Sequence, residues 1–137
     1  MFEVEGRKGQ GKGGGFYDYD ENGKKIATWP GLKEVFANDG YVDIPFQDVK
    51  DRLLFPQVLE AIRIMEEGVL SSVADGNIGS IMGIGFPPHT GGVYQCVNAY
   101  GVEAFVDRAE ELAQQYGKVF EPPQLLKDMA ANGTTFA

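Results

Sequence analysis

Cysteine and histidine are almost absent from this chain of 137 residues, which contains one of each. A single cysteine cannot form an internal disulfide, and one Cys with one His cannot complete a Cys/His zinc site. We therefore expect a reducing compartment, with Cys96 as a small core side chain and with no metal site. His89 is the only histidine and thus the one candidate for general acid–base chemistry near neutral pH.

Basic residues are also scarce, since 12 Lys and Arg stand against 20 Asp and Glu and give a formal net charge of −8. Nucleic-acid binding depends on clustered cations that displace counterions, so nucleic acid is not expected as a partner. Apolar runs hold only a few residues, whereas a bilayer span needs roughly 20. No basic segment followed by an apolar one comes after Met1, which argues against a secretory signal. The sequence therefore predicts a cytoplasmic protein without a membrane span.

Glycine is concentrated at the start of the chain, where residues 6–15 contain six of the 19 glycines. Ordering so much glycine is costly, so residues 1–44 are interpreted as an arm or linker with short extended pieces around 15–19 and 25–29. The arm carries aromatic anchors that we expect to dock on its own helical core or on a neighbouring domain: Phe16, Tyr17, Tyr19 and Trp29.

Two phosphate-binding motifs can be fitted to the glycine-rich arm. Residues 6–13 match the spacing of a P-loop, and Gly9, Gly11 and Gly14 match a dinucleotide-binding G-x-G-x-x-G. The P-loop needs a Ser or Thr hydroxyl where this chain has Gly13, and both motifs need a strand before them and a helix after them. We interpret both spacings as products of the glycine content, and we expect this chain to bind no cofactor there.

Residues 45–137 carry helical patterns. Apolar residues at steps of three and four predict a long helix from Pro45 to about Gly68, kinked at Pro56. They are Phe46, Val49, Leu53, Leu54, Val58, Ala61, Ile62, Met65 and Val69. A second helix is expected over about 72–81 with Ser71 or Ser72 as its N-cap, followed by a loop that the glycines and prolines of residues 83–88 enforce.

Three further helices complete the predicted domain. The first runs over 90–99 and is capped by Thr90, and the second carries an apolar stripe from Phe105 to Tyr116 with Arg108 on the opposite face. Gly117 is expected to be its left-handed C-terminal residue. The third begins after Pro122-Pro123 and closes at Gly133. The sequence thus predicts an all-α domain of about five helices over residues 45–137.

Two acidic features have simple structural interpretations. Asp75-Gly76-Asn77 has the first spacing of a calcium loop, but Gly79 and Phe86 stand where further ligands belong, so a helix-capping or turn role is expected. The remaining helical acids are expected on solvated faces. They are Glu60, Glu66, Glu67, Asp107, Glu110 and Glu111.

Several blocks in order resemble the C-terminal helical domain of 3-hydroxyacyl-CoA dehydrogenases. More narrowly, they resemble the second, last copy of that domain in the α-subunit of multifunctional fatty-acid oxidation complexes. The blocks are residues 51–63, 66–70, 73–81, 83–88 and 90–93, with 6–8 and 12–19 resembling the segment that joins the two copies and 116–123, Leu126, 129–130 and Gly133 resembling the C-terminus.

The resemblance implies an all-α fold and a place in fatty-acid β-oxidation, where NAD oxidises a 3-hydroxyacyl-CoA. In the family, the NAD site and the catalytic His–Glu pair lie on a Rossmann domain that this chain does not match. The first copy carries an Asn near the substrate where this chain has Asp51, whose ionised carboxylate would repel acyl-CoA phosphates. We therefore expect no catalytic residue and no bound cofactor, with NAD and acyl-CoA belonging to the parent enzyme, and this chain inactive by itself.

The main hypothesis is a non-catalytic helical domain that gives an interface to the Rossmann and first helical domains of the parent enzyme. Without them, the chain is expected to expose an apolar patch and to form a homodimer. The alternative is a domain that completes the acyl-CoA site, with Asp51, Arg52 and His89 as substrate-binding candidates. A third hypothesis is a free-standing regulatory protein that lost its partner. Acyl-chain length and oligomeric state are left open.

Overall fold

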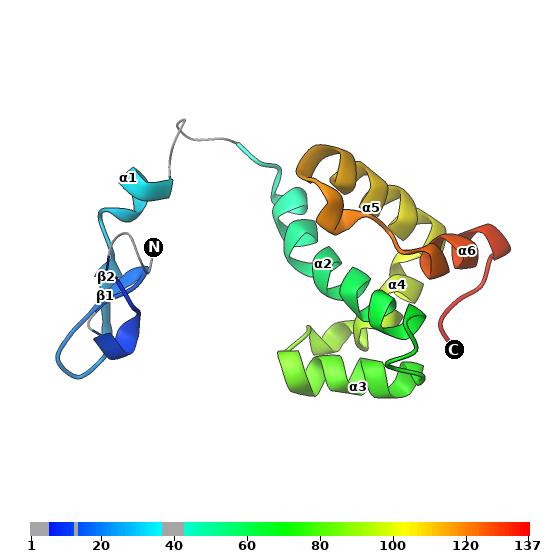
Figure 1. Cartoon of the computed structure of the whole chain (residues 1–137), viewed down its shortest axis with the longest axis horizontal. Coiled ribbons are helices and arrows are strands. Elements are labelled where there is room, and N and C mark those ends of the chain that lie inside the picture. The colour runs from blue at the N-terminus through cyan, green and yellow to red at the C-terminus, as the bar shows by residue number, and fades with distance from the viewer. Residues whose placement is uncertain (1–5, 13, 37–42) are drawn as a thin grey trace. The chain divides into compact units, whose positions relative to one another are not determined.

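The computed structural model describes residues 6–12, 14–36 and 43–137 (Figure 1). The chain divides into two compact units, Met1–Asp43 and Ile44–Ala137. Each unit is described by itself below.

The first unit contains a two-stranded antiparallel hairpin. A short 3₁₀ helix, η1 (Gln10–Lys12), precedes the strands β1 (Tyr17–Tyr19) and β2 (Lys25–Thr28), and a short helix, α1 (Leu32–Phe36), follows them. Tyr17 pairs with Thr28, and the register shifts after Asp18. Both extended pieces predicted in the arm are confirmed as strands, whereas α1 was not predicted.

Arg7 holds the start of this hairpin together. Its Nε donates to the carbonyl of Gly15 at 2.8 Å, and its guanidinium pairs with the Asp18 carboxylate. The guanidinium also lies 4.6 Å from the centre of the Trp29 ring. The side chain of Arg7 therefore ties part of the glycine-rich segment to Asp18 and Trp29, which lie outside it.

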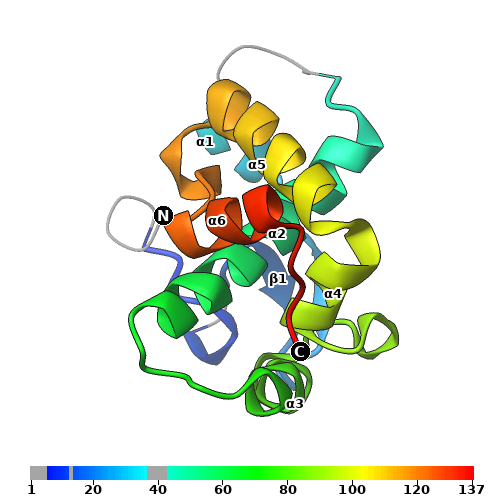
Figure 2. The ribbon, with the colours of Figure 1, turned by 90° about the vertical axis from the view of Figure 1, so that its right-hand side faces the viewer.

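The second unit is built from five α-helices, as predicted for an all-α domain. They are α2 (Phe46–Glu66), α3 (Val73–Ile84), α4 (Val93–Tyr100), α5 (Val102–Tyr116) and α6 (Gln124–Asn132), with the 3₁₀ turns η2 (Pro88–Thr90) and η3 (Lys118–Phe120) between them. Within this unit α5 and α3 lie on opposite sides, with α2 and α4 between them (Figures 1 and 2). Across the described part of the chain, no helix is both long enough and apolar enough to cross a bilayer.

The core of this unit is formed by one face each of α2, α4 and α5. Its fully buried side chains are Val58, Leu59, Ile62, Phe86, Val93, Tyr94, Val97, Phe105, Ala109, Leu112 and Leu126. Phe55 stacks on Phe105 with ring centroids 4.0 Å apart, which links α2 to α5. The predicted apolar stripe of the first long helix is only partly buried, however, because Phe46, Leu53 and Val69 are largely exposed.

Two helix boundaries differ from those predicted. Ser72 is the N-cap of α3, as predicted, and its side chain accepts from the N–H of Asp75, but the helix ends at Ile84 rather than near residue 81. Gly83 is therefore helical, and the stop comes at Gly85, which adopts the left-handed conformation with φ 69°. The next helix begins at Val93 rather than Thr90, because the Thr90 hydroxyl accepts from the N–H of Gly92 and closes a turn instead.

The remaining helix ends follow the sequence more closely. Gly133 ends α6 in the left-handed conformation predicted for it, with φ 63° and ψ 30°. Gly117 ends α5 with positive φ, but its ψ of 177° is extended, so the predicted left-handed cap does not form there. The helix α2 is continuous through Pro56, and the kink expected there stays a prediction.

Candidate functional site

Asp51, a candidate for substrate contact, is buried inside the helical unit with an exposed fraction of 4%. Its Oδ1 accepts from Gln47 at 2.7 Å, and its Oδ2 accepts from Arg108 Nε at 2.8 Å. Both carboxylate oxygens are therefore engaged by side chains of the same unit. Asp51 therefore connects α2 to α5.

Arg108 is the centre of that contact, although the pattern of its helix placed it on the solvent side. Its side chain is only 17% exposed and pairs with Asp48, Asp51 and Glu111. The hydrogen bond to Asp48 raises the pKa of Arg108, with burial opposing it and the other two carboxylates adding to it. The sequence held one usable signal, which is that Asp48 and Asp51 are three residues apart and so share a face of α2.

Tyr116 extends the same network to the end of α5. Its hydroxyl donates to Asp48 Oδ2 at 2.7 Å. The hydrogen bonds from Arg108 and then Tyr116 lower the pKa of Asp48, and the bond to Asp48 raises the pKa of Tyr116. The group is therefore held with Asp48 ionised and the phenol neutral. We define Asp48, Asp51, Arg108 and Tyr116 as the α2–α5 network.

Arg52, the second candidate, lies on the outer side of this network. Its guanidinium carbon is 4.3 Å from the centre of the Tyr116 ring. Together with Val49, Leu53 and Phe120, Arg52 lines a surface groove of about 540 Å³. It is the only one of the three substrate-binding candidates that borders this groove among the described residues.

His89, the third candidate, lies exposed in η2. Among the residues that the structure describes, no hydrogen bond or ion pair joins it to Asp51 or Arg52. The structure therefore does not bring the three candidates together as one substrate site.

The glycines that fit phosphate-binding motifs lie in a tight turn. Gly9 bridges to Gly14, and the segment runs through η1 into the strand β1 rather than into a helix. Gly13, which stands at the hydroxyl position of a P-loop, lies outside the described residues. The strand that follows argues against both motifs, because each needs a helix N-terminus beside the phosphate.

The Asp75-Gly76-Asn77 segment caps a neighbouring helix. The Asn77 Oδ1 accepts from the backbone N–H groups of Tyr94 and Gln95 at 2.9 and 3.2 Å, at the start of α4. The hydroxyl of Ser80 accepts from the N–H of Val93 at 3.3 Å. The capping role expected from the sequence is thus confirmed, but the capped helix is α4, which no local pattern could indicate. No group of three or more potential metal-ligating side chains occurs in the described ranges.

Most of the helical Asp and Glu residues lie on solvated faces, as predicted, but Glu66 makes a further contact. Its side chain accepts from the N–H of Leu125 at 2.7 Å and so caps the start of α6. Arg63 of the same helix donates to the carbonyl of Glu121 at 2.8 Å. These two side chains attach the C-terminal segment to α2.

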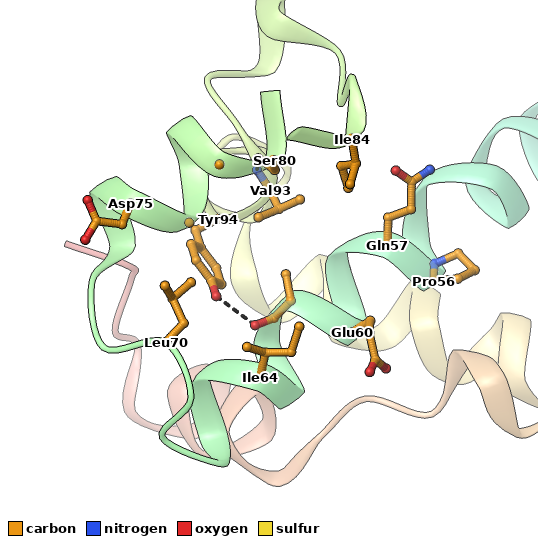
Figure 3. A pocket seen from close by; sticks show the side chains of 13 residues that line it. Pro56, Gln57, Glu60, Ile64, Leu70, Asp75, Ser80, Ile84, Val93 and Tyr94 are labelled. Atoms are coloured by element: carbon orange, nitrogen blue, oxygen red, sulfur yellow. Dashed lines mark hydrogen bonds between the residues drawn. The ribbon is translucent and has the colours of Figure 1, made fainter. Parts of the chain in front are cut away.

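A larger groove, of about 570 Å³, lies between α2 and α3 (Figure 3). We call it the α2–α3 groove. Its apolar lining comprises Pro56, Ala61, Ile64, Leu70, Ile84, Val93 and Tyr94. Tyr94 is fixed there because its hydroxyl donates to the carbonyl of Ala61 at 2.7 Å. The polar members of the lining are Gln57, Glu60, Asp75 and Ser80.

Two glycines of α3 shape the wall of this groove in opposite ways. A Cβ on Gly76 would lie 2.2 Å from the Tyr94 ring and 2.8 Å from the Leu70 side chain, so this glycine permits the close approach of α3 to the core. A Cβ on Gly79 would meet nothing within 4 Å and would point into open space. The groove is therefore an open apolar surface suited to apolar side chains, and it holds no acid–base pair arranged for catalysis among the described residues.

Fatty acid oxidation complex subunit alpha from Shewanella oneidensis is 38% identical to this chain over 130 residues. The match covers 95% of this chain and 18% of that protein, so the chain spans less than a fifth of the length of the relative. No family model matches the chain. The similarity supports the predicted resemblance to fatty-acid oxidation α-subunits, whereas the assignment to the last helical copy stays a prediction.

Proposed function

We propose that the helical unit is a non-catalytic domain of a fatty acid oxidation complex α-subunit, which gives a structural interface to the catalytic part of that protein. The apolar surface of α3 carries this proposal. Ile78 and Met82 are 62% and 81% exposed, although they belong to a helix whose other face packs in the core. The two side chains are one turn apart on the same face of α3, and contiguous exposed apolar surface of this kind marks interaction sites.

The positions of the candidate residues support an interface rather than a reaction site. Both carboxylate oxygens of Asp51 already accept hydrogen bonds from Gln47 and Arg108, and His89 lies exposed on a different element. In this proposal NAD and the acyl-CoA are bound by the Rossmann and first helical domains, the first unit of this chain is the segment that joins the two helical copies, and the protein is cytoplasmic. In isolation, two copies of the chain would pair through the same α3 surface.

Co-expression with the remainder of the relative's α-subunit tests the interface. We expect the 137-residue chain to co-purify with that remainder, and Met82→Glu to abolish the assembly because it places a carboxylate on the interface. Val119→Glu makes the same change at an exposed apolar residue of η3 and should leave the assembly intact. Light scattering gives the mass of each mixture. No assembly of the unmodified chain, or equal loss in both variants, would contradict the proposal.

One observation favours the alternative, in which the chain completes an acyl-CoA site. Arg52 borders an open groove, and a guanidinium is a suitable partner for an acyl-CoA phosphate. Mixing the chain with a separately expressed Rossmann half and following NADH oxidation with acetoacetyl-CoA separates the two proposals. A selective rise in KM with Arg52→Gln or His89→Ala, with assembly unchanged, would support the acyl-CoA role, whereas unaltered kinetics would exclude both residues from it.

A further inference from the structure

We propose that the α2–α3 groove receives an amphipathic helix with apolar anchors and flanking Lys or Arg side chains. The origin of this helix rests on the proposed function, because we expect the helix to belong to the remainder of the α-subunit. The inference concerns the chemistry of the occupant, which the proposed function leaves open.

The centre of the groove selects apolar side chains. Ile64, Leu70 and Val93 gather between α2 and α3 and surround the Tyr94 ring (Figure 3). The Tyr94 hydroxyl is already bonded to a backbone carbonyl, so it offers no free donor to a polar ligand. A volume of about 570 Å³ accommodates more than one large side chain but not a folded domain.

The edge of the groove selects positive charge. Glu60 and Asp75 are its only charged lining residues in the described part of the chain, and both extend away from the apolar centre (Figure 3). Arg63 pairs with Glu60 at 3.2 Å, but it also donates to the carbonyl of Glu121 and does not line the groove. The helical unit as a whole has six Lys and Arg against twelve Asp and Glu. This field disfavours anionic occupants such as fatty-acid carboxylates and acyl-CoA, and favours a cationic one.

The shape of the groove favours a helix. Its two walls are themselves helices, and apolar grooves between helices commonly bind the apolar face of an amphipathic helix. Gly79 contributes no side chain to the wall, so the backbone of α3 is open to close approach at that point. A second copy of this chain fits this groove less well than a cationic helix, because it would bring its own net negative charge to Glu60 and Asp75, which the proposed pairing through Ile78 and Met82 does not involve.

Two synthetic helical peptides of about 18 residues test this chemistry. They share the same leucine positions and differ only in their flanks, which are lysine in one and glutamate in the other. We expect the lysine peptide to bind the full chain about tenfold more tightly by fluorescence anisotropy, with a preference that shrinks as salt rises. Equal affinity of the two peptides would overturn the proposal.

A pair of phenylalanine variants locates the binding. Gly79→Phe fills the groove, whereas Ala131→Phe adds the same side chain at an exposed residue of α6 that does not line it. A Cβ on Gly79 meets no atom from outside its own helix turn within 4 Å, and Ala131 is exposed, so both variants should fold. Gly79→Phe is expected to weaken the lysine peptide about tenfold or more, and Ala131→Phe to leave it within about twofold. Equal effects of the two variants would overturn the proposal.

A pair of charge variants tests the edge. Glu60→Gln with Asp75→Asn should reduce the preference for lysine over glutamate flanks to about twofold, because each exposed pair contributes little by itself. Glu103→Gln with Asp107→Asn removes the same charge from exposed positions of α5 and should leave most of the preference. An unchanged preference in the first variant would overturn the assignment of these carboxylates.

Comparing peptide binding with assembly separates this inference from the proposed function. If the chain assembles with the remainder of the α-subunit and Gly79→Phe does not weaken that assembly, this inference fails and the proposed function stands. If no assembly forms but the lysine peptide binds as described, the proposed function fails and the groove chemistry stands.

Discussion

The α2–α5 network shows how much one charged residue contributes to this domain. Asp51 is buried and has Arg108 as its only cationic partner among the described residues. Removing one member of a buried pair leaves the other charge in a poorly solvating environment, which costs more than the pair gains by forming. The network therefore fixes the position of α5 on α2 rather than adding much to its net stability.

Arg108→Met tests this role. The variant keeps a long apolar stem but leaves Asp48 and Asp51 without their cation, so we expect the free energy of unfolding to fall by about 3 kcal/mol. Urea denaturation followed by circular dichroism measures the change. Lys127→Met is the control, because Lys127 pairs with the exposed carboxylate of Glu110 and should cost less than about 1 kcal/mol. Equal losses would show that the buried pair has no special role.

The pKa shifts in the network predict a dependence of stability on acid. The pKa of Asp48 is lowered in the folded state, first by the hydrogen bond from Arg108. Its contribution to stability is therefore full above the unfolded value of about 4 and is lost as the pH falls through the folded value. We expect the urea midpoint of the unmodified chain to fall more steeply below about pH 4 than that of Asp48→Asn. Parallel curves for the two proteins would contradict this assignment.

At the scale of elements, the start of α4 depends on a side chain from α3. Asn77 accepts from two N–H groups at the first turn of α4, of which that of Tyr94 is buried and that of Gln95 is partly buried. Asn77→Ala leaves them without that partner, so we expect a loss of about 1–2 kcal/mol in the free energy of unfolding. Asn132→Ala, at an exposed position of α6, should change it by less than about 0.5 kcal/mol. Urea unfolding of both variants compares them.

Two glycines of α3 give opposite predictions for the same substitution. Gly79→Ala adds a methyl group where nothing lies within 4 Å, so the gain in helix propensity should stabilise the protein by about 0.5–1 kcal/mol. Gly76→Ala places its Cβ against Tyr94 and Leu70, so overpacking should outweigh propensity and destabilise by about 1–3 kcal/mol. Thermal unfolding of both variants gives the signs. Stabilisation by Gly76→Ala would mean that α3 is not packed closely on α4.

These elements also show what the sequence can predict. The helices were predictable where apolar periodicity meets a local cap, as at Ser72 and Gly133. The start of α4 was misplaced because its capping side chain, Asn77, comes from another helix and leaves no local pattern. The surroundings of Arg108 were mispredicted for the same reason, since its partners Asp48 and Asp51 are about sixty residues away along the chain. The α2–α3 groove likewise depends on how two helices pack, which periodicity does not determine.

At the scale of the whole molecule, the two units differ in how they are held together. Every side chain of the buried hydrophobic core belongs to residues 55–136, within the second unit. Order in the described part of the first unit comes instead from a hairpin and from the contacts of Arg7 with Gly15, Asp18 and Trp29. A short two-stranded hairpin is marginally stable in water without a hydrophobic core. The helical unit therefore has a hydrophobic core with which to fold by itself, whereas the described part of the first unit lacks one.

A truncated chain of residues 44–137 tests this division. We expect it to be helical by circular dichroism and to unfold with a free energy within about 1 kcal/mol of the full chain, because no core contact is removed. A peptide of residues 1–43 should show no cooperative transition. Arg7→Ala in the full chain is the matched control, since it weakens the hairpin and should leave the unfolding of the helical unit unchanged. A large loss of stability on truncation would show instead that the first unit contributes to the helical core.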